Sequence, residues 1–222
     1  LKNGDVLEGR YEILGEIGAG GIGVIYLAMD RNLQKQVVVK KIKEHYAGRL
    51  ESRAEVDILK NLHHVSLPQV YDFIQYGTQI YTVMDYIRGR DLQQYLDSGY
   101  VFREEKLLSW LWQLLDVLDY LHSQKPPIYH CDIKPANIMV TEEQKVCLID
   151  FNISLGDEEK TIKGISQWYC APEQRQALFG PAVFDQRMDL YSLGAVFYAL
   201  MTGWLPSGQG ESAWPEQIGQ RY

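Results

Sequence analysis

The periodicity of the apolar residues changes near residue 86, and this change limits the possible folds more than any other feature of the sequence. Between Tyr11 and about Tyr86 the chain consists of short strand-like runs broken by glycines, with one helical stretch among them. Beyond this point, long stretches have the apolar spacing of helices. Such segregation indicates an α+β protein with two lobes. We expect a β-rich N-lobe at residues 1–86 and a helical C-lobe at residues 87–222.

The expected N-lobe contains five strands and one helix. The strands, which are rich in β-branched or alternating apolar residues, lie at residues 11–17, 23–29, 36–42, 70–76 and 80–85. The helix is expected at about residues 48–62, where apolar residues recur with helical spacing. In the C-lobe, residues 103–122 would be apolar on most of the circumference of a helix, which is typical of a helix buried inside a lobe.

Residues 190–206 carry no charge, and two interpretations compete for them. A membrane span would explain the lack of charge. The stretch nevertheless contains glycines and hydroxyl residues, ends at Pro206, and is short for crossing about 30 Å of hydrocarbon. We therefore expect a buried core helix there.

Composition disfavours several classes of function and location. The 222 residues carry a formal net charge of -7, whereas a nucleic-acid binder needs a surplus of Lys and Arg on one face. Three cysteines without metal-like spacing fit free thiols in a reducing compartment, so the cytoplasm is the expected location. The first ten residues include acids and no apolar segment, which does not support a signal peptide. We expect no nucleic-acid partner and no membrane segment in this chain.

A glycine cluster lies between the first two expected strands. Gly18, Gly20 and Gly23 form a G-x-G-x-x-G motif, and Gly21 lies inside it. These glycines lie at the tip of a hairpin and not at the start of a helix. They therefore favour a flap over a triphosphate rather than a dinucleotide site. A merely tight turn would use the same residues, so the motif alone leaves both alternatives open.

Val38 and Lys40 share one face of the third expected strand, because side chains alternate along a strand. Ile25 can share this face from the neighbouring strand. The two apolar side chains would then enclose a flat base, and the amine would meet its phosphates. A strand-end lysine is more often solvated, so Lys40 alone shows no function. Glu55, however, lies on the apolar stripe of the expected helix and needs a partner, for which Lys40 is the natural candidate.

The most specific feature is a set of polar residues on either side of a short apolar strand. Asp132, Lys134 and Asn137 lie in the run Y-H-C-D-I-K-P-A-N, and Asp150 follows the strand in L-I-D-F-N. In phosphoryl transfer, Asp132 can accept a hydroxyl proton and Lys134 can neutralise charge on the transferred group. Asn137 and Asp150 offer hard oxygen ligands for Mg²⁺. Singly, each would more often be a turn or cap residue, but their order and spacing favour the chemistry.

With these motifs the chain resembles the catalytic domains of eukaryotic-like serine/threonine protein kinases, and its opening looks most like the bacterial members. Further matches are Y-C-A-P-E at residues 169–173 and D-L-Y-S-L-G at residues 189–194, so the resemblance covers about residues 10–206. It implies a two-lobed kinase-like fold with a nucleotide-binding N-lobe, and transfer of phosphate from ATP, with Mg²⁺, to protein substrates. It also implies catalytic roles for Asp132, Lys134 and Asn137, and metal binding by Asn137 and Asp150.

By the same resemblance, many residues are expected to contact the nucleotide. Met84 would be the gatekeeper, Asp85 and Ile87 would contact adenine through their backbone, Asp91 would contact the ribose, and Met139 would form the floor of the adenine site. The full set is Ile17, Gly18, Gly20, Gly21, Gly23, Ile25, Val38, Lys40, Glu55, Met84, Asp85, Ile87, Asp91, Met139 and Asp150.

The chain departs from the family in three places. Cys131 replaces an arginine that normally binds a phosphate on the activation loop, which argues against that mode of switching. Asn152 replaces a glycine, and because asparagine tolerates unusual backbone angles, we expect Mg²⁺ binding to survive. After Pro206 the family continues with more helices, whereas this sequence has a polar tail. We expect a C-lobe that lacks its last helices, so that the chain is either marginally stable or is covered there by its own tail, by self-association or by further domains.

Two functions are compatible with these features. One is an active kinase, in which Lys134 and Ser166 resemble the serine/threonine branch rather than the tyrosine branch. The other is a pseudokinase that binds ATP or a partner with little transfer activity. The complete set of polar residues favours the active kinase.

Overall fold

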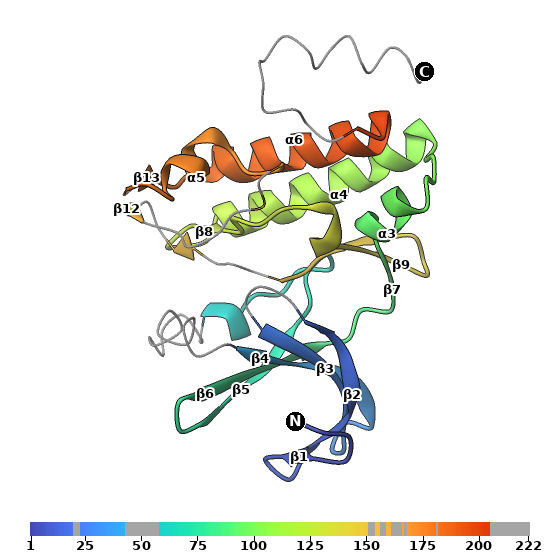
Figure 1. The fold of residues 1–222 in the computed structure, drawn as a ribbon, viewed down its shortest axis with the longest axis vertical. Helices are drawn as coiled ribbons and strands as arrows, with labels where there is room; N and C mark the ends of the chain where they lie inside the picture. Colours follow the sequence, from blue (N-terminus) through green and yellow to red (C-terminus); the bar gives the residue numbers. More distant parts are fainter. Residues whose placement is uncertain are drawn as a thin grey trace. The chain divides into compact units, whose positions relative to one another are not determined.

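A computed structural model of the chain describes residues 1–19, 23–42, 58–150, 154–155, 159–160, 166, 168–180 and 182–204. The chain divides into two compact units, Leu1–Ile87 and Arg88–Tyr222 (Figure 1). The expected α+β architecture is confirmed, because the first unit is built on an antiparallel sheet and the second mainly on helices.

The first unit contains a six-stranded antiparallel sheet. Its strands are β1 (Val6–Leu7), β2 (Tyr11–Ala19), β3 (Gly23–Asp30), β4 (Lys35–Ile42), β5 (Val70–Tyr76) and β6 (Gln79–Asp85). Their order across the sheet is β1-β2-β3-β4-β6-β5. All five expected strands are present, and β1 was not predicted because two residues are too short to show a period. Of the expected helix at residues 48–62, the structure describes only a helical turn at residues 58–60.

Alternation along the strands gives this sheet two unlike faces. Residues on one face, such as Val37 and Val39, are fully buried in a cluster with Tyr11, Ile13 and Tyr26. Residues between them in sequence, such as Val38, are only half-buried. One face of the sheet therefore forms the core of the unit, and the opposite face carries Ile25, Val38, Lys40 and Met84, four of the residues that were predicted to contact the nucleotide.

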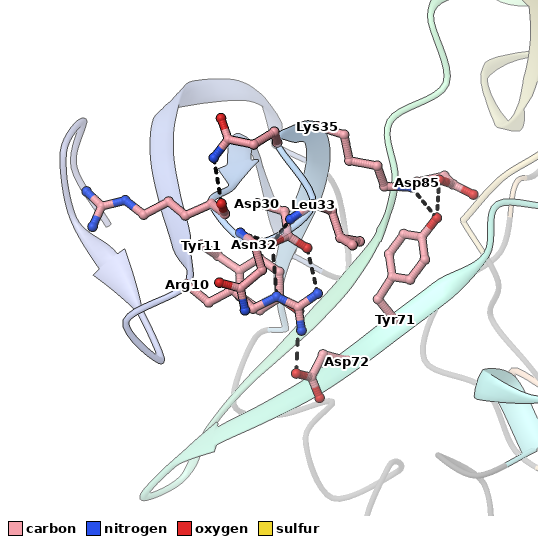
Figure 2. A network of polar contacts seen from close by, with 11 residues as sticks. Arg10, Tyr11, Asp30, Asn32, Leu33, Lys35, Tyr71, Asp72 and Asp85 are labelled. Atoms are coloured by element: carbon pink, nitrogen blue, oxygen red, sulfur yellow. Dashed lines mark hydrogen bonds and ion pairs between the residues drawn. The ribbon is translucent and has the colours of Figure 1, made fainter.

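A network of polar contacts joins the ends of the strands on the core side (Figure 2). Asp30 is fully buried at the end of β3. Its carboxylate accepts hydrogen bonds from Nε and Nη2 of Arg10, at 3.0 and 2.7 Å, and from the backbone N–H groups of Asn32 and Leu33. The arginine pairs with this carboxylate through both nitrogens and also lies over the ring of Tyr11. The ion pair joins the residue before β2 to the end of β3, and the bonds from Asn32 and Leu33 hold the turn that links β3 to β4.

The second unit contains the helices of the C-lobe and several short strands. The helices are α3 (Leu92–Asp97), α4 (Glu104–His122), α5 (Pro172–Gln176), α6 (Gln186–Thr202) and the 3-10 turn η1 (Pro135–Asn137). The strands are β7 (Gly89–Asp91), β8 (Ile128–Tyr129), β9 (Ile138–Thr141), β10 (Val146–Leu148), β11 (Ser154–Leu155), β12 (Glu159–Lys160) and β13 (Ala182–Val183). They pair as β10-β9-β7, β11-β8 and β12-β13. The helices α4 and α6 pack side by side (Figure 1).

The predicted helix at residues 103–122 is α4, but it is not buried all round. Leu107, Trp110, Leu114 and Leu118 form its buried side, whereas Trp112 on the other side is 72% exposed. An apolar side chain at a helical position thus does not by itself show burial, because much of a folded protein's surface is apolar.

The predicted core helix at residues 190–206 is α6, with different ends. It begins at Gln186, where the carboxylate of Asp185 accepts the N–H of Arg187, and it ends at Thr202. Gly203 has a left-handed φ of 73°, which ends a helix and which glycine adopts without strain. Most residues of α6 are buried. Within the part of the chain that the structure describes, no helix is both long and apolar enough to cross a membrane.

Candidate functional site

The register of the first sheet brings three of the predicted nucleotide residues into one row. Ile25 pairs with Gly18 on one side and with Lys40 on the other. Directly paired residues of antiparallel strands project to the same face, so Ile25 and Lys40 are neighbours, as the alternation predicted. Lys40 is only 7% exposed, which shows that it is not a solvated strand-end lysine. Its expected partner, Glu55, lies outside the described residues.

The next row on the same face contains Val38 and Met84. They pair directly across β4 and β6, and both are half-buried. Ile17, near the end of β2, is 49% exposed. A flat apolar ligand therefore has half-covered aliphatic side chains available on this face.

The glycine motif is described only at its two ends, since Gly20 and Gly21 lie outside the described residues. At Gly23 the structure gives a steric reason for glycine. A Cβ atom there would lie 2.2 Å from the carbonyl oxygen of Lys41, which no side chain tolerates. At Gly18 a Cβ would meet nothing within 4 Å, so packing does not explain that glycine. The close approach of β3 to β4 thus explains the glycine at position 23. The glycine at position 18 has no such packing reason, which is compatible with a role in ligand binding.

Asp85, at the end of β6, is held by four hydrogen bonds, here called the latch, and Figure 2 shows its carboxylate beside Tyr71 and Lys35. Its carboxylate accepts Tyr71 Oη at 2.5 Å, Lys35 Nζ at 3.1 Å and the N–H of Gln69 at 3.0 Å. Its own N–H donates to the carbonyl of Gln69 at 3.0 Å. Burial and this carboxylate raise the pKa of Tyr71, so the phenol stays a donor. The latch fixes the strand end from which Ile87 follows two residues later.

Asp91 and Met139 are direct neighbours, because they pair across β7 and β9. The Asp91 carboxylate also caps α3, accepting the N–H of Gln94 at 2.8 Å. This capping bond holds the side chain that was expected to contact the ribose. Gly89 begins β7, and a Cβ there would lie 2.0 Å from the carbonyl oxygen of Val140. Only glycine permits this approach of β7 to β9.

The carboxylate of Asp132 is the centre of the polar cluster in the second unit. Lys134 Nζ donates to its Oδ2 at 2.7 Å, and Asn137 Nδ2 donates to the same oxygen at 3.0 Å and to the backbone carbonyl of Asp132 at 2.8 Å. Ser166 Oγ donates to Oδ1. The structure therefore brings together all three predicted catalytic residues and Ser166. The hydroxyl of Ser166 thus already lies where the carboxylate of Asp132 could accept a proton from it.

Asn137 and Asp150 are connected through the backbone. The N–H of Ile149, one residue before Asp150, donates to the carbonyl of Asn137 at 2.8 Å. Asp150 has a φ of 65°, a left-handed conformation that aspartate adopts more readily than most residues. Among the described residues, no hydrogen bond involves the side-chain oxygen of Asn137. An amide oxygen and a carboxylate fit Mg²⁺, which prefers hard oxygen ligands and keeps several water or phosphate oxygens.

Two buried residues that were not assigned roles hold this loop in place. The carboxylate of Asp189, on α6, accepts the N–H groups of His130 and Cys131 and Nε2 of His122, each at 2.9 Å. Burial lowers the pKa of His130, which keeps its ring neutral. The ring accepts the N–H of Asp132 at its Nδ1 and faces the carbonyl of Ile149 with Nε2. A carboxylate directly before the uncharged stretch of residues 190–206 was the available signal for Asp189, because a buried charge needs partners.

Known proteins with similar sequences identify the family of this chain. The protein kinase domain matches residues 11–220. A probable serine/threonine-protein kinase of Clostridium acetobutylicum is 34% identical over 212 residues, which are 91% of this chain and 31% of that protein. PrkC, a serine/threonine-protein kinase of Bacillus subtilis, is 31% identical over 95% of this chain and 33% of its own length. The chain thus spans about a third of the length of these curated relatives.

The fold leads to the same family. The crystal structure of a double mutant of the PknI kinase domain of Mycobacterium tuberculosis has a TM-score of 0.79 and 25% sequence identity, and the match covers 99% of this chain and 86% of that one. Both the family match and this fold extend over nearly all of the chain. The chain belongs to the protein kinase family.

Proposed function

We propose that this chain transfers the γ-phosphoryl group of ATP to serine or threonine hydroxyls of protein substrates. The observation that carries the proposal is the bond from Ser166 Oγ to Oδ1 of Asp132. It supports a role for this carboxylate as the acceptor of a hydroxyl proton. The substrate oxygen would form a bond to the γ-phosphorus while the bond from that phosphorus to the β–γ bridging oxygen breaks.

The remaining residues have separate roles in this proposal. Lys134, which donates a hydrogen bond of 2.7 Å to Asp132, would neutralise charge on the transferred group. Asn137 and Asp150 would hold Mg²⁺, which supplies charge neutralisation on the phosphates when bound. In the first unit, Lys40 would position the phosphates, and Ile25, Val38 and Met84 would contact the base. The other nucleotide residues predicted from the sequence keep their proposed roles.

The chain's three cysteines are free thiols, which supports a cytoplasmic location for this part of the protein. ATP as a substrate agrees with that compartment.

The alternative is a module that binds ATP or a partner without transferring phosphate. Transfer from labelled ATP, with Mg²⁺, to the chain itself and to a generic basic protein separates the two. Asp132→Asn should lose at least about a hundredfold in turnover and keep nucleotide binding, because it removes only the proton acceptor. Lys40→Met should lose turnover through poorer phosphate positioning.

Two results would count against the proposed function. One is the absence of transfer by the folded wild-type chain. The other is an Asp132→Asn variant with most of the wild-type rate. The matched control is Asp119→Asn, which changes an exposed aspartate on α4 and should leave the rate unchanged.

A further inference from the structure

Gln174 is a buried polar residue on α5 with both ends of its amide in use. It is 1% exposed. Its Oε1 accepts the N–H of Ala171 at 3.1 Å, and its Nε2 donates to the carbonyl of Cys131 at 2.8 Å. One side chain therefore links the segment before α5 to the loop that carries Asp132. The two segments are 43 residues apart in sequence.

Cys131 is the residue at which this link acts on the loop. Its N–H donates to Asp189, and its carbonyl accepts Gln174. Its φ of 62° is a left-handed conformation that residues other than glycine, asparagine and aspartate rarely adopt, so the surrounding bonds must hold it. Because the carbonyl belongs to the peptide that joins Cys131 to Asp132, Gln174 sets the orientation of that peptide plane.

The other end of the link leads back to the same carboxylate. The N–H groups of Tyr169 and Cys170 donate to the carbonyl of Ser166, at 2.9 and 3.0 Å. The hydroxyl of Ser166 donates to Asp132. The hydrogen bonds thus close a ring that runs from Asp132 to Ser166, along the chain to Ala171, through Gln174 to Cys131, and back to Asp132.

We propose that Gln174 is a positioning residue, which holds Asp132 in the orientation for proton acceptance by tying its loop to the segment that contains Ser166. This rests on the proposed function, and it adds how the site is ordered. The Gln174 amide is uncharged and bonds to two uncharged backbone groups, the N–H of Ala171 and the carbonyl of Cys131. Ordering by Gln174 therefore requires no phosphate group on the chain, and its strength does not depend on salt.

The test compares substitutions at Gln174 with the same substitutions at Gln176, an exposed residue of the same helix. Gln174→Met removes both bonds at similar volume, and Gln174→Glu keeps the acceptor for Ala171 but loses the donor to Cys131. We expect both to lower kcat about tenfold to a hundredfold, since small misplacements of catalytic groups cost this much. The KM for ATP should stay within about twofold, because among the described residues Gln174 bonds to Ala171 and Cys131, and neither is a predicted nucleotide residue. Gln176→Met and Gln176→Glu should match the wild type.

A second measurement is independent of transfer activity. Amide hydrogen exchange, followed by mass spectrometry, should become faster in the peptide that contains Cys131 and Asp132 when Gln174 is changed to Met or Glu, and not in the Gln176 variants. Thermal melting checks that each variant is folded, and Gln174→Glu decides if Gln174→Met does not fold.

The outcomes separate the two proposals. A folded Gln174 variant with wild-type kcat and wild-type exchange would overturn the positioning role. The positioning role would also be overturned if kcat, the affinity for ATP and the melting temperature all fell together, because such a result indicates general destabilisation. If the wild type transfers no phosphate, the proposed function fails, and the exchange data still decide whether Gln174 orders the loop.

Treatment of the protein with a phosphatase tests whether the ordering needs a phosphate group. Full activity of the treated protein supports ordering without phosphate, and loss of activity contradicts it.

Discussion

The ion pair between Arg10 and Asp30 gives a direct test of how the first unit is held together. Arg10→Ala removes two charge-assisted hydrogen bonds from a fully buried carboxylate. Removing one partner of a buried pair costs about 3–5 kcal/mol. Asp30 would keep its two backbone donors, and the arginine is 30% exposed, so water can enter the vacated space. We therefore expect a loss near the lower end, about 3 kcal/mol.

Urea denaturation followed by circular dichroism and by tryptophan fluorescence measures this loss. All five tryptophans lie after residue 87, so fluorescence reports only on the second unit. The expected shift should therefore appear in the circular dichroism transition of the first unit, which contains the sheet. Arg31→Ala is the matched control, because its ion pair with Glu12 is exposed and should contribute less than about 1 kcal/mol. A loss below about 0.5 kcal/mol for Arg10→Ala, or a loss equal to that of Arg31→Ala, would refute the reasoning.

The same pair predicts a dependence on pH with a definite sign. Hydrogen bonds from the Arg10 guanidinium lower the pKa of Asp30. A carboxylate whose pKa is lowered in the folded state contributes its full stability above its unfolded pKa, about 3.9 for aspartate. That contribution is lost as the pH falls through the folded pKa. The difference in unfolding free energy between wild type and Arg10→Ala should be constant above about pH 5 and should shrink in more acid solution.

Three further predictions concern the site. Tyr71→Phe removes the hydroxyl that joins Lys35 to Asp85. It should raise the KM for ATP about fivefold with little change in kcat, which corresponds to the loss of a hydrogen bond contributing roughly 1 kcal/mol. An unchanged KM would contradict a role for the latch. Saturating ATP with Mg²⁺, at about a hundredfold excess over Kd, should stabilise the fold by about 2.7 kcal/mol in thermal melting, and no shift would argue against nucleotide binding. Ser166→Ala should lower turnover strongly. Thr161→Ala should not, because Cys131 cannot bind a loop phosphate, and a large loss from Thr161→Ala would show that loop phosphorylation is needed.

Local patterns in the sequence were enough to predict the first sheet and the main helices. The strands were visible as short runs rich in β-branched or alternating apolar residues, and residues 36–42, Q-V-V-V-K-K-I, are an example of the β-branched kind. Asp132, Lys134 and Asn137 were found because they lie within six residues of one another, so their spacing is readable along the chain. Helix ends were less predictable: α6 ends at Thr202, where Gly203 adopts its left-handed conformation, whereas the apolar stretch continues to residue 206.

The tertiary structure alone decided which distant groups meet. Gln174 and the carbonyl of Cys131, or Tyr71 and Asp85, are joined by single hydrogen bonds across long separations in sequence. Such a bond has no period and no local motif, and either partner could equally have faced water. The exposure of Trp112 was likewise decided by what packs against α4 and not by its apolar character. Sequence periodicity determined which segments form strands and helices, because that choice depends on neighbours along the chain. Folding determined how the polar groups are paired, because a buried donor or acceptor must find its partner wherever the chain brings one near.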